Sequence, residues 1–392
     1  MKKLLLVNPP AKQKVIRDYY CGHSVKGDYF WVPIDLVMLS RLDDYEIKII
    51  DFMIEDVAIG EQAATDFNPD IIIGMVWEKI LNDDLSYLRN LKIKTGADEL
   101  YFIGDASKFH SNKLKNLNDG EHILESFFHL ENSGLGKFSL PKHHLLNLQK
   151  YSMPYSLYHG VLTVLTAYAC PFKCSFCNSG SYAYVERPIV EIVEELRQIK
   201  KMGVKEIYFR DFTFTANEPR VRELCAEMIK NDFNFVWSCD ARANVSRDTL
   251  SAMARAGCYL AFFGVESAHD KTLLAVHKSI TRQMLERVFS DCHSLGIKVL
   301  ASFIIGLPDE TEKEIWQTLD FAKQFCDYAS FNTFEGRIGA DLQIKKGSEE
   351  FTKKIEKFFY MRPQYIIKQF FSIRTFFQFK NLILNGLSIF KK

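Results

Sequence analysis

The stretch VLTVLTAYACPFKCSFC at residues 161–177 places an apolar, β-rich run directly before three closely spaced cysteines. Similar runs follow it along the chain, and helical patterns fit the gaps that separate them. The expected strands lie near residues 161–167, 205–210, 234–238, 258–264, 298–305 and 328–334. Such a repeat predicts a partial (β/α)6 barrel of the TIM type, whose chemistry sits on loops at the carboxyl ends of the strands.

Sequence signals for individual helices support this interpretation. Pro188 suits a first helical turn, and Gly203 is a stop signal at the other end of the same helix. Thr311 and Glu314 have the spacing of a capping box ahead of a later helix. The expected core face of the first helix consists of Ile189, Ile192, Val193, Leu196 and Ile199.

A smaller α/β domain is expected ahead of the barrel, over residues 1–125. Its β-rich runs at 3–8, 45–51, 70–77 and 99–103 alternate with helical patterns at 33–42, 60–67 and 83–93. This alternation predicts a doubly wound, Rossmann-like parallel sheet. We interpret residues 126–160 as a linker, 161–340 as the barrel and 341–392 as a helical tail.

The composition is that of a balanced globular chain. Of the 392 residues, 47% are hydrophobic, which is enough for a buried core. The 50 Lys and Arg against 49 Asp and Glu leave a formal net charge of +1, so no nucleic acid partner is expected. No run reaches the ~18 apolar residues of a membrane-spanning helix, and the opening MKKLLLVNPP lacks the pattern of a secretory signal. The expected location is the cytoplasm, where the cysteines are reduced thiols.

The cysteine loop has the spacing C-x3-C-x2-C, formed by Cys170, Cys174 and Cys177. A structural zinc site needs four protein ligands, usually in two pairs, and no matching second pair lies nearby in the sequence. A disulfide is disfavoured among reduced thiols. Three thiolates can instead hold three irons of a [4Fe-4S] cluster and leave the fourth iron open to a small molecule with an amine and a carboxylate.

This loop, including the aromatic Phe176 before its last cysteine, resembles the signature of the radical S-adenosylmethionine (SAM) enzymes. The resemblance implies that the open iron chelates the methionyl part of SAM. An electron from the cluster then cleaves the sulfonium to give methionine and a 5′-deoxyadenosyl radical, which abstracts hydrogen from an unactivated carbon. It also implies an external reductant such as flavodoxin or ferredoxin.

Segments that end later strands match the same family in order. They are Arg210-Asp211-Phe212, Cys239-Asp240-Ala241-Arg242, Gly264-Val265-Glu266-Ser267 and Phe303-Ile304-Ile305-Gly306-Leu307-Pro308-Asp309-Glu310-Thr311. The resemblance implies that Glu266 and Arg242 pair with the amino and carboxylate groups of SAM, and that the backbone around Phe176 meets the adenine. Further SAM contacts are implied at Asp211, Ser302 and Gly306.

Each of these residues also has a purely structural interpretation. Asp211 can cap a loop, Arg242 can pair with a surface carboxylate, and Gly306 can turn the chain into the next helix. The sequence also departs from the family, because Tyr168-Ala169 stands where relatives often have Arg-Gly. A Gly-Gly-Glu segment seen in other branches is absent from the second barrel strand.

The first domain resembles the cobalamin-binding branch of this family, on the strength of the opening KKLLLVNPP and the later WVPIDLVMLSRL. The resemblance implies a cobalamin between the domains and, in many members, transfer of its methyl group to a carbon radical. Other members use the pair for oxidation or ring rearrangement. An Asp-x-His-x-x-Gly loop, which supplies a lower cobalt ligand in other cobalamin domains, is absent.

The tail from Phe351 to Lys392 is basic and aromatic. It has nine Lys and Arg against the single acid Glu356, a local charge of +8, and eleven Phe and Tyr. Such a segment can lie on the inner face of an anionic membrane, or it can cap the barrel as helices with solvated bases. If it contacts a membrane, an acyl or isoprenoid lipid is the natural substrate class.

The leading hypothesis is a radical SAM enzyme that carries out cobalamin-dependent C-methylation of a lipid or natural-product intermediate. An alternative keeps the cluster but not cobalamin, and the radical alone drives dehydrogenation, cyclisation or rearrangement. A hypothesis of another class is a non-catalytic iron-sulfur protein used in electron transfer or sensing. The sequence names no individual substrate.

Overall fold

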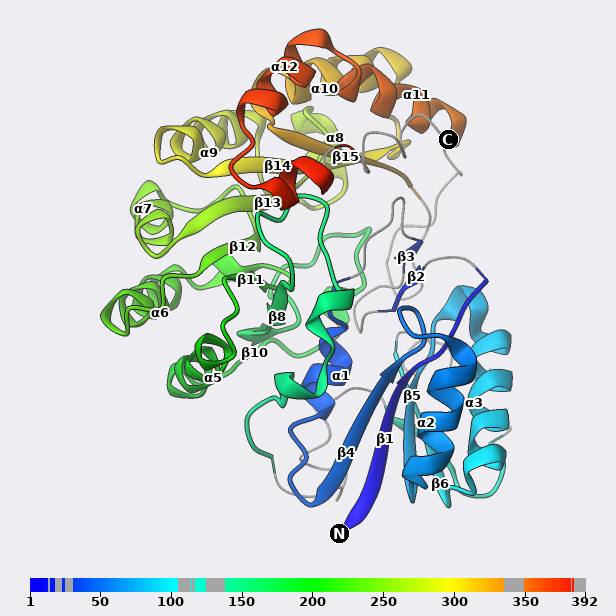
Figure 1. Cartoon of the computed structure of the whole chain (residues 1–392). Coiled ribbons are helices and arrows are strands. Elements are labelled where there is room, and N and C mark those ends of the chain that lie inside the picture. Colours follow the sequence, from blue (N-terminus) through cyan, green and yellow to red (C-terminus); the bar gives the residue numbers. More distant parts are fainter. Residues whose placement is uncertain are drawn as a thin grey trace. The chain divides into compact units, whose positions relative to one another are not determined.

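The computed structural model describes residues 1–12, 15–17, 23–24, 31–104, 114, 117–124, 138–334, 349–381 and 383. The chain folds as two compact units, Met1–Thr163 and Val164–Lys392. Each unit contains a parallel sheet, and Figure 1 follows both along the sequence from blue to red.

The first unit is a doubly wound sheet with the strand order β4-β1-β5-β6-β7. Its strands are β1 (Lys2–Asn8), β4 (Tyr45–Asp51), β5 (Ile71–Met75), β6 (Glu99–Ile103) and β7 (Glu121–Leu124), and every pair is parallel. The expected Rossmann-like α/β class is therefore confirmed, with chain order 2-1-3-4-5. Strand β7 was not predicted, because its sequence EHIL reads as polar; its buried Glu121 is matched by Arg89 at 2.8 Å. A short antiparallel pair, β2 (Val15–Ile16) with β3 (His23–Ser24), is separate from this sheet.

Helices cover both faces of this sheet. Leu5 and Val7 of β1 belong to the core cluster shared with α2 (Val57–Phe67) and α3 (Leu81–Thr95). The alternate residues of β1 are also buried and face α1 (Ile34–Leu39). Burial on both faces explains why β1 is a continuous apolar run in the sequence. Figure 1 shows α2 and α3 side by side along one face of the sheet.

Buried polar side chains fill the carboxyl ends of β1 and its neighbours. Arg17 is 2% exposed and forms a bidentate pair with Asp84, at 2.7 and 3.1 Å. Its guanidinium also donates to Asn8, which in turn donates to Asp51. Burial raises the pKa of Asp51 to about 6. The order of the sheet reverses between β1 and β5, so this network lies at the switch point where doubly wound sheets bind ligands.

The second unit contains the expected six-stranded parallel sheet, in the order β15-β14-β13-β12-β11-β8. The strands are β8 (Leu162–Val164, which crosses the unit boundary), β11 (Glu206–Phe209), β12 (Val236–Ala241), β13 (Cys258–Glu266), β14 (Lys298–Ile305) and β15 (Tyr328–Thr333). The predicted partial (β/α)6 barrel is confirmed. Strand β8 ends at Val164 rather than near residue 167, because the chain then forms the small hairpin β9 (Ala167–Tyr168) with β10 (Val185–Glu186).

Helices alternate with these strands and lie along the outer face of the curved sheet (Figure 1). They are α5 (Ile189–Lys201), α6 (Glu218–Lys230), α7 (Arg247–Arg255), α8 (Asp270–Ala275), α9 (Arg282–Ser294) and α10 (Glu312–Phe325). The gap between β13 and β14 holds two helices, since α8 is a short additional one. Pro188 is the N-cap of α5, Gly203 after α5 has φ +76°, and the capping box of Thr311 with Glu314 is confirmed.

The cysteines outside the loop are structural where the structure describes them. Cys225, Cys239, Cys258, Cys292 and Cys326 are buried in the barrel unit, as predicted for small apolar side chains. Cys21 lies outside the described residues.

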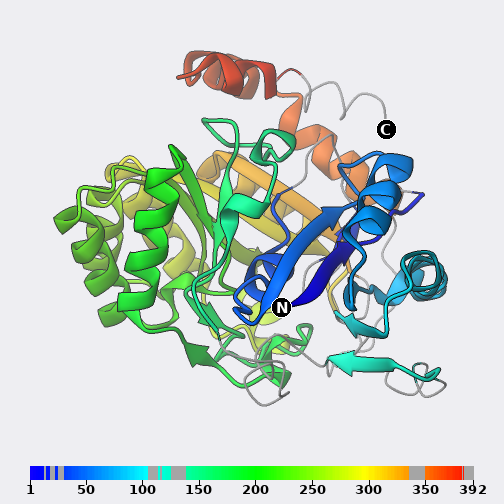
Figure 2. The same cartoon turned by 60° about the horizontal axis from the view of Figure 1, so that its bottom comes forward.

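The tail forms α11 (Glu349–Tyr360) and α12 (Pro363–Phe371), and a further helical turn follows at 376–381. Helix α11 packs on β15 and α10 with Ile355 and Phe359 fully buried. Figure 2 shows α12 in red at the edge of the barrel unit. Within the described ranges, no helix combines the length and apolar character that a membrane crossing requires.

Candidate active site at the barrel mouth

The three predicted cysteines lie on the loop that leaves the β8–β9 segment, and each thiol is partly exposed. Each Sγ has a polar neighbour from the barrel mouth or from the loop itself. These are Thr213 Oγ1 for Cys170 at 3.4 Å, Arg242 Nη1 for Cys174 at 3.6 Å, and Ser179 Oγ for Cys177 at 2.8 Å. Among the described residues, no three Cys, His, Asp or Glu side chains converge as ligands of a single metal ion.

The loop begins at a strained residue. Ala169 has φ +56°, in the left-handed region that favours glycine. This backbone gives a physical reason for the glycine that relatives often carry at the matching position. The turn directs the chain from the barrel wall into the cysteine loop.

Asp211 anchors the start of this loop from the end of β11. Its side chain is buried and accepts the backbone N–H of Thr166 at 2.6 Å, while its second oxygen accepts the hydroxyl of Thr166. Burial raises the pKa of Asp211 to about 6. Both carboxylate oxygens therefore bind Thr166, four residues before Cys170. This matches the loop-capping interpretation of Asp211, and a SAM contact at this residue stays a prediction.

Asp211 should make stability fall with rising pH. The unfolded carboxyl loses its proton near the ordinary pKa of 3.8, whereas the folded one keeps it up to about 6. Between these values the folded state binds more protons, so the free energy of unfolding decreases by roughly 3 kcal/mol across the window. Denaturant titrations of Asp211→Asn between pH 4 and 7 should show a flatter dependence, because asparagine is neutral throughout. Asp320→Asn, an exposed change on α10, is the control, and an equal slope in all three proteins would refute the assignment.

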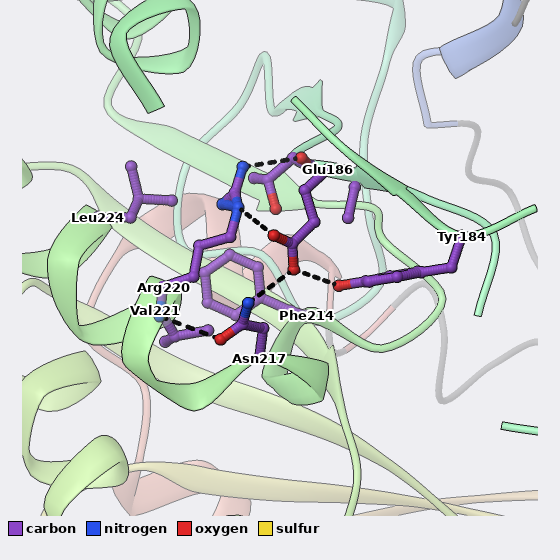
Figure 3. Close-up of a pocket in the computed structure, with 9 residues that line it drawn as sticks. Tyr184, Glu186, Phe214, Asn217, Arg220, Val221 and Leu224 are labelled. Carbon is purple, nitrogen blue, oxygen red and sulfur yellow. Dashed lines mark hydrogen bonds and ion pairs between the residues drawn. The ribbon is translucent and has the colours of Figure 1, made fainter. Parts of the chain in front are cut away.

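A polar network supports the same loop from outside the barrel (Figure 3). Glu186 accepts from Tyr184 at 2.9 Å and from Asn217 at 3.0 Å, and it pairs with Arg220 at 3.4 Å. Arg220 also donates to the carbonyl of Thr166 at 3.2 Å. The pocket that these side chains line is about 10 Å³, close to the size that holds one water. The pocket is too small for a substrate, and the side chains around it serve to hold Thr166.

Arg242 lies where the sequence placed it, directly after β12, and it is 5% exposed. Its guanidinium stacks over the ring of Phe172 at 4.2 Å and donates to the thiol of Cys174. Arg242 is thus brought to the cysteine loop, and it forms no surface ion pair within the described residues.

Glu266 ends β13 in a left-handed conformation, with φ +68° and a register shift between Gly264 and Glu266. Its carboxylate pairs with the ammonium of Lys278 at 2.8 Å, and both side chains are less than 10% exposed. Lys278 also lies 5.6 Å from the ring centroid of Phe176. Lys278 was not predicted, because nothing in its local sequence marks it as the partner of Glu266.

Phe176 packs on an apolar cluster at the barrel mouth, formed by Val276, Leu307 and Phe334 with Ile304. Ser302 on β14 accepts from Asn332 at 3.3 Å. Gly306 has φ +90°, and its N–H donates to Glu310 at 3.1 Å. Burial raises the pKa of Glu310 to about 7, and this side chain also accepts from Ser267. Glu310 was part of the recognised segment but was not predicted as a site residue.

Polar atoms without a partner surround the loop. The hydroxyl of Ser175, the amide oxygen of Asn178 and Nε of Arg242 are buried and make no hydrogen bond within the described residues. Buried polar groups of this kind normally have a partner. Three partly exposed thiols beside unpaired polar atoms fit a polar group larger than a single ion.

A comparison with known proteins identifies the barrel. The family model described as the radical SAM superfamily matches residues 164–322, which include the cysteine loop and the ends of β11 to β14. The barrel unit carries a radical SAM domain. The match places all three cysteines, Asp211, Arg242, Glu266, Ser302 and Gly306 within this domain.

Relatives extend the similarity beyond the barrel. The protein called uncharacterized methyltransferase PH0819, from Pyrococcus horikoshii, is 26% identical and covers 95% of this chain and 96% of its own length. An anaerobic magnesium-protoporphyrin IX monomethyl ester cyclase of Rubrivivax gelatinosus is 28% identical over 50% of this chain and 37% of its own length. The chain is therefore similar to radical SAM proteins over the barrel unit, and to PH0819 over nearly its whole length.

Two solved structures share the fold of both units. The radical SAM methyltransferase TsrM from Kitasatospora setae has a TM-score of 0.62 at 14% identity, over 85% of this chain and 75% of that chain. The cobalamin-dependent SAM radical enzyme OxsB has a TM-score of 0.61 at 16% identity, over 94% of this chain and 56% of that chain. Both proteins were solved with cobalamin bound. The expected two-part architecture, an N-terminal cobalamin-binding-type domain followed by a barrel, is confirmed at the level of fold.

Proposed function

We propose that this radical SAM enzyme methylates an unactivated carbon of a lipid or natural-product intermediate, with cobalamin as the methyl carrier. The observation that carries the proposal is the barrel mouth itself. Three partly exposed thiols lie on one loop, and Arg242 donates to one of them at 3.6 Å. Asp211 and Arg220 both bind Thr166, which lies just before this loop.

The three cysteines would hold a [4Fe-4S] cluster, which when bound supplies the electron that cleaves SAM. The guanidinium of Arg242, stacked on Phe172, would offset the negative charge of the thiolates. Its remaining N–H groups, including the unpaired Nε, would donate to the carboxylate of SAM. The carboxylate of Glu266 would accept hydrogen bonds from the amino group of SAM. The ammonium of Lys278 already pairs with this carboxylate and would compete for it. Phe176 and its apolar cluster would exclude water from the adenine side.

Cobalamin is the proposed ligand of the first unit. The strand order reverses between β1 and β5, and the carboxyl ends there form the position at which doubly wound sheets bind nucleotide-like cofactors. The similar structures of TsrM and OxsB, both solved with cobalamin, support the same assignment. Flavodoxin or ferredoxin is the proposed electron donor.

One anaerobic experiment tests the proposal. The protein is reconstituted with iron and sulfide, mixed with hydroxocobalamin and desalted, and then given dithionite and SAM. Bound corrinoid, 5′-deoxyadenosine and S-adenosylhomocysteine are quantified. Retained corrinoid with formation of both nucleosides is the expected result, because S-adenosylhomocysteine reports methyl donation and 5′-deoxyadenosine reports SAM cleavage.

Other outcomes separate the alternatives. Formation of 5′-deoxyadenosine without retained corrinoid would favour radical dehydrogenation, cyclisation or rearrangement without cobalamin. A reconstituted cluster that yields neither nucleoside, with or without extracts that contain candidate lipids, would favour the non-catalytic iron-sulfur protein.

A further inference from the structure

Helix α12 and the turn after it bury polar side chains and expose apolar ones. Gln369 is 6% exposed, and Gln378 is 3% exposed. Gln369 donates to the carbonyl of Asp327, and Gln378 accepts the backbone N–H of Arg374. An ordinary surface helix has the opposite pattern, with its apolar stripe toward the core. The burial therefore indicates that the apolar side of this segment has another partner.

The exposed apolar side chains form a continuous helical face. On α12 this face comprises Ile366, Ile367, Phe370 and Phe371, which are 55%, 56%, 63% and 82% exposed. The spacings i, i+1, i+4 and i+5 place all four within about 140° of the helix circumference. Phe376, Phe379 and Ile383 follow α12 in the chain and are also exposed, with Phe376 82% exposed. We call the described residues of this stretch, 366–381 and 383, the apolar rim.

The rest of the described surface lacks this concentration. Half of the large apolar side chains that are exposed in the described residues, nine of 18, belong to the tail from Phe358 to Ile383. The other nine are scattered from Met1 to Leu274. Scattered exposed apolar residues are normal, but a contiguous set marks a contact surface.

Basic side chains border the apolar rim. Lys353, Lys354 and Lys357 are exposed on α11, and Arg374 and Lys380 are exposed within the rim itself. Residues 349–383 contain seven Lys and Arg against three acids, Glu349, Glu350 and Glu356, so the segment keeps a net positive charge. Lys368 is already paired within the protein, because its ammonium lies 2.9 Å from the carboxylate of Asp327. The charge complements an anionic surface, and it disfavours a second copy of the same tail, since two positive rims would repel each other.

We propose that residues 349–383 dock this enzyme on anionic lipid bilayers, with α11 as the fixed base and the apolar rim as the inserted surface. Helix α11 is anchored on β15 and α10, and the buried Gln369 and Gln378 orient the next segment with its aromatic side outward. Bulky aromatic side chains enter the boundary between headgroups and acyl chains, while Lys and Arg pair with anionic headgroups. The tail thus divides into a cap, α11, and a membrane-facing part.

Vesicle flotation tests this surface with the full chain. Vesicles of phosphatidylcholine alone are compared with vesicles that also contain phosphatidylglycerol. We expect binding to the anionic vesicles that weakens as salt is added. The double change Phe370→Ser with Phe371→Ser should weaken partitioning at least about tenfold, because it removes two exposed aromatic rings from the inserted surface.

Two further variants make the test specific. Arg374→Gln with Lys380→Gln should weaken binding to anionic vesicles about tenfold and leave binding to neutral vesicles unchanged. Leu274→Ser on α8 removes a side chain that is 77% exposed elsewhere on the barrel, and it should bind like the natural chain. Phosphatidylinositol-free vesicles exclude recognition of a special headgroup.

The proposal is overturned if the natural chain does not float with anionic vesicles at low salt, or if the Phe370 and Phe371 variant floats equally well. It is also overturned if the same variant abolishes self-association, measured by analytical ultracentrifugation, while vesicle binding is absent. A second copy of the chain would then be the partner of the apolar rim. Circular dichroism of each variant excludes unfolding as the cause of lost binding.

Discussion

Replacement of Cys174 by alanine should reduce bound iron and 5′-deoxyadenosine to background while the protein stays folded. Cys174 is partly exposed on the loop and accepts from Arg242 at 3.6 Å, so its loss removes one proposed iron ligand without opening the core. Two thiolates do not retain a cluster that needs three protein ligands. Iron analysis and the visible absorption of reconstituted protein measure the first effect, and chromatography of the nucleosides measures the second.

Cys225→Ala is the matched control, because Cys225 is buried in α6 and lies far from the loop in the sequence. This variant should lose some stability to a small cavity but keep its iron and its nucleoside formation. Equal iron in Cys174→Ala and the natural chain would contradict the assignment of the cysteine loop. Equal loss in the two variants would indicate unfolding rather than ligand removal, and thermal unfolding curves separate these cases.

The sheets could be predicted because their strands are buried on both faces. Apolar runs such as Ile71–Met75 have few other interpretations once helical patterns separate them. Strand β7 escaped prediction because its inward-facing Glu121 depends on Arg89, which lies 32 residues earlier. The short helix α8 escaped because six residues contain too few turns to show a periodic apolar face.

The candidate site also has a part that the sequence predicts and a part that it does not. The cysteine loop and the ends of the barrel strands are local in sequence, so spacing and resemblance were enough to find Cys170 and Arg242. The partners that give these residues their charge and orientation are not local. Lys278 reaches Glu266 only because the loop after α8 returns to the barrel mouth, and Thr213 meets Cys170 across 43 residues. No pattern in a single sequence encodes these pairings.

The second large effect is expected at the buried pair of Glu266 and Lys278. Lys278→Met leaves the carboxylate of Glu266 buried, with its ammonium partner gone, and should cost about 3 kcal/mol in the free energy of unfolding. Glu266→Gln should cost a similar amount, since it leaves the ammonium of Lys278 without its counter-charge at 2.8 Å. The double variant removes both charges and should be more stable than the sum of the single losses by more than about 1 kcal/mol.

These two single variants and the double variant form a double-mutant cycle. Glu227 and Lys230 on α6, an exposed pair at 2.8 Å, provide the control cycle. Glu227→Gln with Lys230→Met should show no measurable coupling, because water screens an exposed pair. Additive losses at Glu266 and Lys278 would contradict their assignment as a buried ion pair.

The same variants also test the ligand role of Glu266. SAM should stabilise the natural chain against thermal unfolding, but it should stabilise Glu266→Gln much less. If Lys278 competes with the amino group of SAM, then Lys278→Met, although less stable, should bind SAM more tightly than the natural chain, because Glu266 no longer has to share its charge.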